Sequence, residues 1–212
     1  MTSNDTPGRF VVVNEQPEYQ PLPWNELQPE TDAALKAANK EGSTSDCIYI
    51  NTDAWDTINS HINWGRDVQS NSVEQGGLLL GRAYTHTASG SIYGKVEKAI
   101  PGYTAEGSMA YLKFDHSTWK KMLEEFDELT SQEEWADLQI IGWYHTHPGR
   151  LSVFMSGTDM NTQQKMFSKN WQFAIVLNPQ KQTWRAFRGA NASECNGEII
   201  KQIVHGNTTL SY

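Results

Sequence analysis

Four side chains in the second half of the chain have the types and the spacing of a hydrolytic metal site. They are His145, His147, Ser156 and Asp159. A catalytic zinc ion usually takes three protein ligands from His, Asp or Glu and leaves its fourth position to water. The two histidines and Asp159 form such a set, and Ser156 adds a hydroxyl group nearby. The segment therefore predicts metal-assisted hydrolysis.

The residues around the two histidines predict a strand that ends at this site. The run from Leu138 to Tyr144 is mostly apolar, which is typical of a buried strand. Side chains two apart on a strand point to the same face, so His145 and His147 can reach one ion together. Pro148 lacks a backbone donor and ends the strand. A loop follows, and Ser156 opens a helix.

Ser156 and Asp159 also fit an ordinary helix start. A serine followed three residues later by an acid caps free backbone amides and suits the helix dipole. Two histidines separated by one residue are likewise a weak motif when taken alone. The joint pattern is more specific, because it gathers two imidazoles, a carboxylate and a hydroxyl around one point.

Hydrolysis of this kind needs a further carboxylate that accepts a proton from water and later gives one to the leaving amine. Glu74 is the candidate. It opens the run Glu74-Gln-Gly-Gly-Leu-Leu-Leu-Gly81, in which an acid precedes an apolar strand and glycines permit close backbone approach. From the residues alone, Glu74 is one acid among many.

The chain resembles the MPN/JAMM zinc metalloproteases, which are also called JAB-type. The resemblance rests on Glu74 in a Glu-x-Gly-Gly-x-Leu-x-Gly context, then on His145-Thr-His-Pro148, and then on Ser156-Gly-Thr-Asp159. It covers roughly residues 47 to 190. Within this range the chain is similar to the deubiquitinases of the proteasome lid and the signalosome, and to bacterial stand-alone JAB peptidases.

The resemblance implies an α/β fold of the MPN (JAB/cytidine-deaminase-like) type, a mixed β-sheet flanked by helices, here with an N-terminal extension. It implies one Zn²⁺ per chain, held by His145, His147 and Asp159. It also implies that Glu74 is the general base toward zinc-activated water and that Ser156 donates to the oxyanion. No substrate-binding residue is identified by it.

The activity that the resemblance implies is an isopeptidase or peptidase that cuts after the C-terminal glycine of ubiquitin or a ubiquitin-like protein, in deconjugation or in precursor maturation. A homodimer or an MPN-type partner is compatible with it. Two alternatives stay open. One is a non-catalytic MPN scaffold subunit, which the complete set of site residues argues against. The other is a zinc peptidase with another task, such as trimming a sulfur-carrier protein or a role in DNA metabolism.

Composition excludes several other classes of protein. The 212 residues carry 25 acidic and 17 basic side chains, a net charge of -8, which argues against a nucleic-acid partner. Cys47 and Cys195 lie far apart in the sequence and predict free thiols. No apolar stretch reaches membrane-spanning length and the N-terminus does not resemble a signal peptide, so the expected location is the cytoplasm, with no membrane partner.

The chain divides into a proline-containing N-terminal arm, residues 1–45, and a catalytic MPN/JAMM domain, residues 46–212. Five of the eight prolines precede residue 30 and break any long element there. A short strand at Phe10–Val13 and a short helix at Thr31–Lys40 are expected, and the arm docks either on the domain or on a partner.

Within the domain, hydrophobic periodicity predicts alternating strands and helices. The first helix is expected to follow a strand and to be capped by Asp53. The expected strands cover residues 47–50, 78–80, 92–100, 138–144, 173–177 and 183–187, and the expected helices begin at Asp53, cover residues 117–129 and cover residues 156–167.

The remaining histidines have no partner at ligand spacing and are not expected to bind metal: His61, His86, His116 and His205. His116 is the hardest to dismiss, because in the resembled family the stretch from Gly102 to Trp119 borders the active site. In the loop before Ser156, Val153 and Phe154 are expected to pack against the domain.

Overall fold

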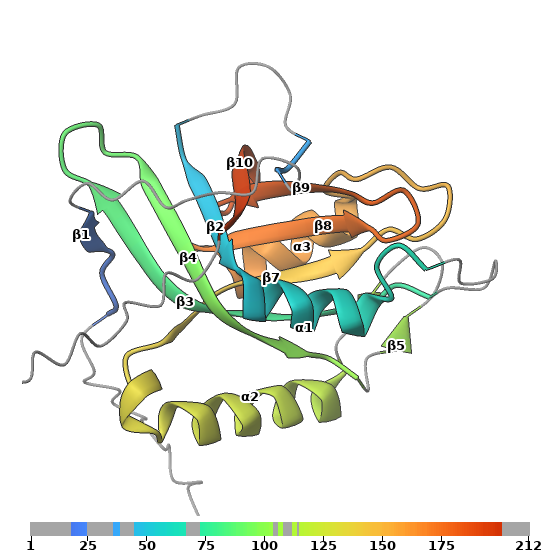
Figure 1. Ribbon diagram of the computed structural model, residues 1–212, viewed down its shortest axis with the longest axis horizontal. Coiled ribbons are helices and arrows are strands. Elements are labelled where there is room, and N and C mark those ends of the chain that lie inside the picture. The colour runs from blue at the N-terminus through green and yellow to red at the C-terminus, as the bar shows by residue number, and fades with distance from the viewer. Residues whose placement is uncertain are drawn as a thin grey trace, which may run out of the picture.

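The computed structural model of the chain (Figure 1) describes residues 18–24, 36–38, 45–66, 73–103, 106–107, 112–113 and 115–200. The strand expected at Phe10–Val13 lies outside these residues, as does most of the helix expected at Thr31–Lys40. Residues 36–38 are described and belong to neither a helix nor a strand.

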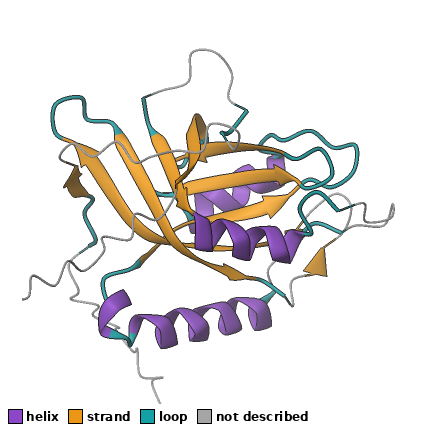
Figure 2. Cartoon of the chain, viewed as in Figure 1, coloured by secondary structure: helices purple, strands orange, loops and turns teal. Residues whose placement is uncertain are grey.

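A mixed sheet of eight strands forms the centre of the fold (Figures 1 and 2). Strand β3 pairs with β7 as well as with β4, so the sheet closes on itself. A separate two-stranded sheet contains β5 (Glu106–Gly107) and β6 (Leu112–Lys113). In spatial order the strands of the large sheet are β1 (Leu22–Trp24), β3 (Gly76–His86), β4 (Ile92–Pro101), β2 (Cys47–Asn51), β10 (Ser193–Ile200), β9 (Thr183–Arg188), β8 (Phe173–Asn178) and β7 (Gln139–Thr146).

Helices cover both faces of this sheet, which confirms the expected mixed α/β class. Helix α1 (Thr52–Ile62) packs on a core that includes Trp55 and Ile58. Helix α2 (His116–Thr130) contributes Met122 to a second core. This core also contains Phe167, the C-cap residue of α3 (Gly157–Met166). A short 3-10 helix, η2 (Glu133–Trp135), follows α2. No helix in the described part of the chain is both long and apolar enough to cross a membrane.

The start of α1 differs from the expected one. Asn51, and not Asp53, is the N-cap, since its side-chain oxygen accepts a hydrogen bond of 2.9 Å from the backbone N–H of Ala54. Asp53 lies in the first turn, where its charge suits the helix dipole. Both residues are helix-start types, and the end of strand β2 at Asn51 decides between them.

Two glycines in the paired strands β3 and β7 let neighbouring backbones approach closely. A Cβ atom on Gly77 would lie 2.2 Å from the carbonyl oxygen of Ile100, on the neighbouring strand β4. A Cβ atom on Gly142 would lie 2.2 Å from the carbonyl oxygen of Phe173, on strand β8. Real Cβ contacts are never this short, so both positions require glycine.

The described part of the arm docks on the domain. Strand β1 adds to the sheet beside β3, in parallel. The hydroxyl of Tyr19 donates to the carbonyl oxygen of Ala83 at 3.2 Å and accepts from its N–H at 2.9 Å. The Trp24 ring lies edge-on to Tyr84 with 4.9 Å between centroids. The division of the chain at residue 45 stays a prediction.

The two cysteines are free and buried, as expected. In the pairing of β2 with β10, Cys47 lies opposite Asn196, so Cys195 points to the other face of the sheet. Burial raises the pKa of the Cys47 thiol to about 12 and the pKa of Cys195 well above its ordinary value. Both thiols are therefore protonated at neutral pH.

Native protein at pH 8 should react with a thiol reagent at least about 100-fold more slowly than the unfolded chain, because the reactive thiolate is scarce and inaccessible. Release of the coloured product from an aromatic disulfide reagent measures both rates. Two thiols per chain should react at once in denaturant. A fast phase of one equivalent in native protein would contradict the burial of one of the cysteines.

Candidate metal centre

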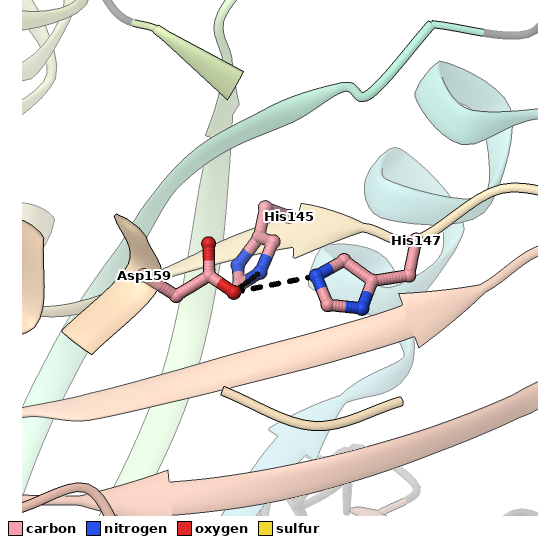
Figure 3. Close-up of side chains that lie close together, drawn as sticks. All are labelled: His145, His147 and Asp159. Atoms are coloured by element: carbon pink, nitrogen blue, oxygen red, sulfur yellow. Dashed lines mark hydrogen bonds and ion pairs between the residues drawn. The ribbon is translucent and has the colours of Figure 1, made fainter. Parts of the chain in front are cut away.

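Three of the predicted site residues meet at one point (Figure 3). Histidines 145 and 147 come from the end of β7 and the residue after it, and Asp159 comes from the first turn of α3. The Oδ2 atom of Asp159 lies 3.3 Å from His145 Nε2 and 3.3 Å from His147 Nε2. The three residues are 0%, 3% and 4% exposed. One ligand atom from each lies within 4.8 Å of the others, so the group can hold a metal ion.

The polar atoms left without partners fit a bound cation. Nδ1 of His145 has no hydrogen-bond partner among the described residues, and neither does Oε2 of the nearby Glu74. Buried polar atoms almost always have partners, because an unpaired one costs free energy. Two imidazoles and a carboxylate are also the donor types that zinc takes in hydrolytic sites. The residues present therefore suit a zinc ion.

Glu74 lies beside this group, although 71 residues separate it from His145. Strands β3 and β7 are antiparallel with Gly76 opposite His145, and the N–H of Thr146 donates to the Gln75 carbonyl oxygen at 2.8 Å. This pairing brings Glu74 Oε1 to 4.0 Å from His147 Nε2. Burial, together with the negative charge of Asp159, raises the pKa of Glu74 to about 7, although His147 lowers it.

Ser156 is the N-cap of α3 and forms a capping box with Asp159. Its hydroxyl oxygen accepts from the backbone N–H of Asp159 at 3.3 Å, and its own N–H donates to Asp159 Oδ2 at 2.7 Å. The cap uses a lone pair of the hydroxyl group and not its proton. Capping the helix and donating to a substrate oxygen are therefore compatible roles for Ser156.

The ring of His147 is oriented by the loop that joins β7 to α3. Its Nδ1 lies 2.7 Å from the carbonyl oxygen of Ser152. Because a carbonyl only accepts, Nδ1 carries a hydrogen. When the ring is neutral, the Nε2 atom, which faces Asp159 Oδ2 at 3.3 Å, carries the lone pair that would bind a metal ion. Asn178, at the end of β8, holds the loop through the carbonyl oxygens of Gly149 at 3.0 Å and Leu151 at 2.9 Å.

Burial and the neighbouring side chains shift the pKa of each of the three residues. Burial lowers the pKa of His145, which keeps this imidazole neutral. Burial also opposes the charged form of His147, but hydrogen bonds with Asp159 and Ser152 outweigh it and raise the pKa. Burial alone would raise the pKa of Asp159, but the polar contacts with both histidines bring it below its usual range. The carboxylate is therefore ionised at neutral pH.

The other described histidines lie outside the group. His61 is buried and its Nδ1 lies 2.9 Å from the Tyr144 hydroxyl. The ring of His86 contacts Ser89 in a turn, and His116 is exposed at the first residue of α2. His205 lies outside the described residues. Among the residues that the structure describes, His145, His147 and Asp159 are the one group able to hold a metal.

The two apolar side chains of the loop behave differently. Val153 packs on the second core, as expected. Phe154 remains 46% exposed, and its ring meets His147 edge-on with 5.2 Å between centroids. The expectation that Phe154 packs against the domain is therefore met only on the side facing His147.

Comparison with known proteins identifies the family. A family model described as JAB1/Mov34/MPN/PAD-1 ubiquitin protease matches residues 47–170, a range that includes all five candidate site residues. The chain belongs to this JAB/MPN family. The resemblance inferred from the motifs is thus confirmed, and the mixed α/β architecture is that of an MPN domain.

Two curated relatives match about half of the chain. The first is the NAD(+) hydrolase TcpA of the archaeon Theionarchaea archaeon (strain DG-70-1), 29% identical over 115 residues, which are 54% of this chain and 30% of the relative. The second is COP9 signalosome complex subunit 5 of Kluyveromyces lactis, 27% identical over 117 residues, which are 54% of this chain and 28% of the relative. The chain thus matches less than a third of the length of either relative.

Proposed function

We propose that the protein is a zinc-dependent isopeptidase or peptidase that cleaves after the C-terminal glycine of ubiquitin or a ubiquitin-like protein. One observation carries the proposal: Glu74 lies 4.0 Å from His147 in a buried group that can hold a metal ion. The JAB/MPN family, whose model is named for a ubiquitin protease, supports this substrate class.

The site residues take separate roles in this proposal. His145, His147 and Asp159 hold the zinc ion, which when bound supplies Lewis-acid chemistry and makes water a nucleophile at neutral pH. Glu74 Oε1 accepts a proton from the attacking water and later gives it to the nitrogen of the leaving amine. Burial raises the pKa of the Glu74 carboxyl group, and a higher pKa makes its carboxylate a better proton acceptor.

Ser156 stabilises the oxygen on which negative charge develops during attack on the carbonyl carbon. Its hydroxyl proton is not used by the helix cap, and its position three residues before Asp159 keeps it at the site. A single donor of this kind contributes about 3–4 kcal/mol in other hydrolases. No side chain of the protein forms a covalent bond to the substrate in this scheme.

A panel of substrates tests the proposal. Purified protein is incubated with ubiquitin and ubiquitin-like proteins that carry linear or isopeptide-linked C-terminal extensions, with a sulfur-carrier precursor and with NAD⁺. Mass spectrometry locates the bond that is cut. Cleavage after the terminal glycine that stops with a zinc chelator and returns with zinc is the expected result.

Other outcomes favour other functions. Cleavage that persists after zinc is removed would overturn the proposed chemistry. Cutting of the sulfur-carrier precursor alone would keep the chemistry and change the substrate. Consumption of NAD⁺ without peptide cleavage would favour the activity named for the archaeal relative. Binding of an intact ubiquitin-like protein with no cleavage of any substrate would favour a scaffold subunit.

A further inference from the structure

The two imidazoles of the metal centre are oriented in different ways. His147 has the usual outer partner of a metal-binding histidine, a backbone carbonyl at 2.7 Å from Nδ1. The Nε2 atom of His145 faces Asp159 Oδ2 at 3.3 Å, but its outer nitrogen, Nδ1, has no hydrogen-bond partner among the described residues. Because His145 lacks the outer hydrogen bond that orients His147, a contact with the face of its ring helps to set the ring plane.

The face of the His145 ring contacts the indole ring of Trp143. The two rings are stacked, with 4.4 Å between their centroids and 14° between their planes. Trp143 also stacks with Phe167, with 5.8 Å between centroids and 10° between planes. Tilting the His145 ring would reduce its contact area with the indole. The indole can therefore hold the imidazole plane, provided that its own position is fixed.

Gln163 fixes the indole through a buried hydrogen bond. Trp143 Nε1–H donates to Gln163 Oε1 at 2.7 Å, and Gln163 is fully buried. The amide nitrogen of Gln163 donates to the carbonyl oxygens of Phe167 at 2.8 Å and Gly189 at 3.3 Å. A donor on one side of the amide and acceptors on the other leave it a single orientation.

Gln163 also lies one helical turn after the metal ligand Asp159. Residues four apart on a helix share a face, so one face of α3 carries both side chains. Asp159 on this face places its carboxylate in the metal centre. Gln163 on the same face holds Trp143, which in turn contacts the ring of His145. The two ligands are thereby coupled, although they come from different elements.

We infer that Gln163 is a positioning residue for the metal centre and acts on His145 through Trp143. It does not touch the metal or the substrate in this role. The inference rests on the metal centre of the proposed function and is independent of which substrate is cut.

The test measures metal binding in variants of the full chain. Gln163→Met keeps the length of the side chain but removes the acceptor for the indole N–H. Chelator competition should show about 10-fold weaker zinc binding, as for other outer partners of metal ligands. The visible absorption bands of the cobalt-loaded protein should shift, because they report the arrangement of the ligands.

Trp143→Phe breaks the same link from its other end, and it serves if Gln163→Met yields no folded protein. It keeps an aromatic ring beside His145 but removes the N–H that Gln163 holds. We expect a similar loss of zinc affinity. The double variant should lose no more affinity than the single ones, since both remove one interaction.

Gln172→Met is the matched control. Gln172 is another buried glutamine, whose amide nitrogen donates to the Ile140 carbonyl oxygen at 3.2 Å and whose oxygen accepts from the N–H of Lys169 at 3.2 Å. It should lower the melting temperature of the apoprotein but leave zinc affinity and the cobalt spectrum unchanged.

Three results separate the possible failures. Unchanged zinc affinity and cobalt spectrum in Gln163→Met would overturn the inference alone, and so would equal changes in Gln172→Met. A wild-type protein that binds neither zinc nor cobalt would overturn both the inference and the proposed metal centre. A wild-type protein that binds metal but cuts no peptide would leave the inference standing and overturn the peptidase assignment.

Discussion

Replacing Glu74 with glutamine should lower kcat by about 10²- to 10⁴-fold, the usual contribution of a general acid–base group. Glutamine has almost the same shape as glutamate but cannot accept a proton. Glu74 is not one of the three grouped ligands, so zinc binding should stay within about 3-fold of the wild type. Initial rates of peptide cleavage and chelator competition measure the two quantities in the same preparation.

Glu97→Gln is the control for this experiment. Glu97 is also a buried carboxylate, but it lies on β4 and accepts a hydrogen bond of 3.2 Å from Asn51. The control removes one buried negative charge and should keep full activity per folded molecule. A Glu74→Gln protein that retains a tenth or more of the wild-type kcat would rule out Glu74 as the general base.

Replacing Asp159 with asparagine should abolish tight zinc binding. The amide oxygen can still accept from the N–H of Ser156, so the start of α3 should remain capped. The charge that attracts the cation is lost. Zinc affinity should fall by more than about 100-fold, the largest loss usual for residues that hydrogen-bond a metal ligand without binding the metal themselves. Wild-type protein should melt at a higher temperature when zinc is added, whereas the variant should not.

Asp53→Asn provides the matched control for Asp159→Asn. Asp53 lies in the first turn of α1 and is exposed, so it is a helix-start carboxylate without a place in the metal centre. Its variant should show the full rise in melting temperature with zinc. An equal rise in Asp159→Asn would mean that zinc binds elsewhere on the protein.

Local patterns predicted much of the fold. Helices α2 and α3 begin and end within one residue of the predicted limits, because apolar spacing and cap residues act over a few positions. Strand β10 was missed, since Ser193–Ile200 contains Glu, Asn and Gly, which are depleted in strands. It forms because β9 and β2 pair with it on both sides, which no local pattern records.

The sequence also failed to reveal what orients the ligands. Trp143 was predicted only as part of an apolar strand, and Gln163 was not singled out, although its spacing from Asp159 was a signal. The carbonyl of Ser152 that faces His147 carries no sequence signal, because any residue has a carbonyl. These contacts depend on how β7, α3 and the loop between them pack together.

The sequence by itself determined the local parts of the site. His145 and His147 share a face because strands repeat every two residues, and Ser156 and Asp159 meet because a helix start brings such residues together. Glu74 was different, since no short-range rule connects it with residues 71 positions away. Only the antiparallel pairing of β3 with β7, in which Gly76 faces His145, placed its carboxylate beside the metal centre. Strand register is set by the packing of the whole sheet, which is why the tertiary structure decided that contact.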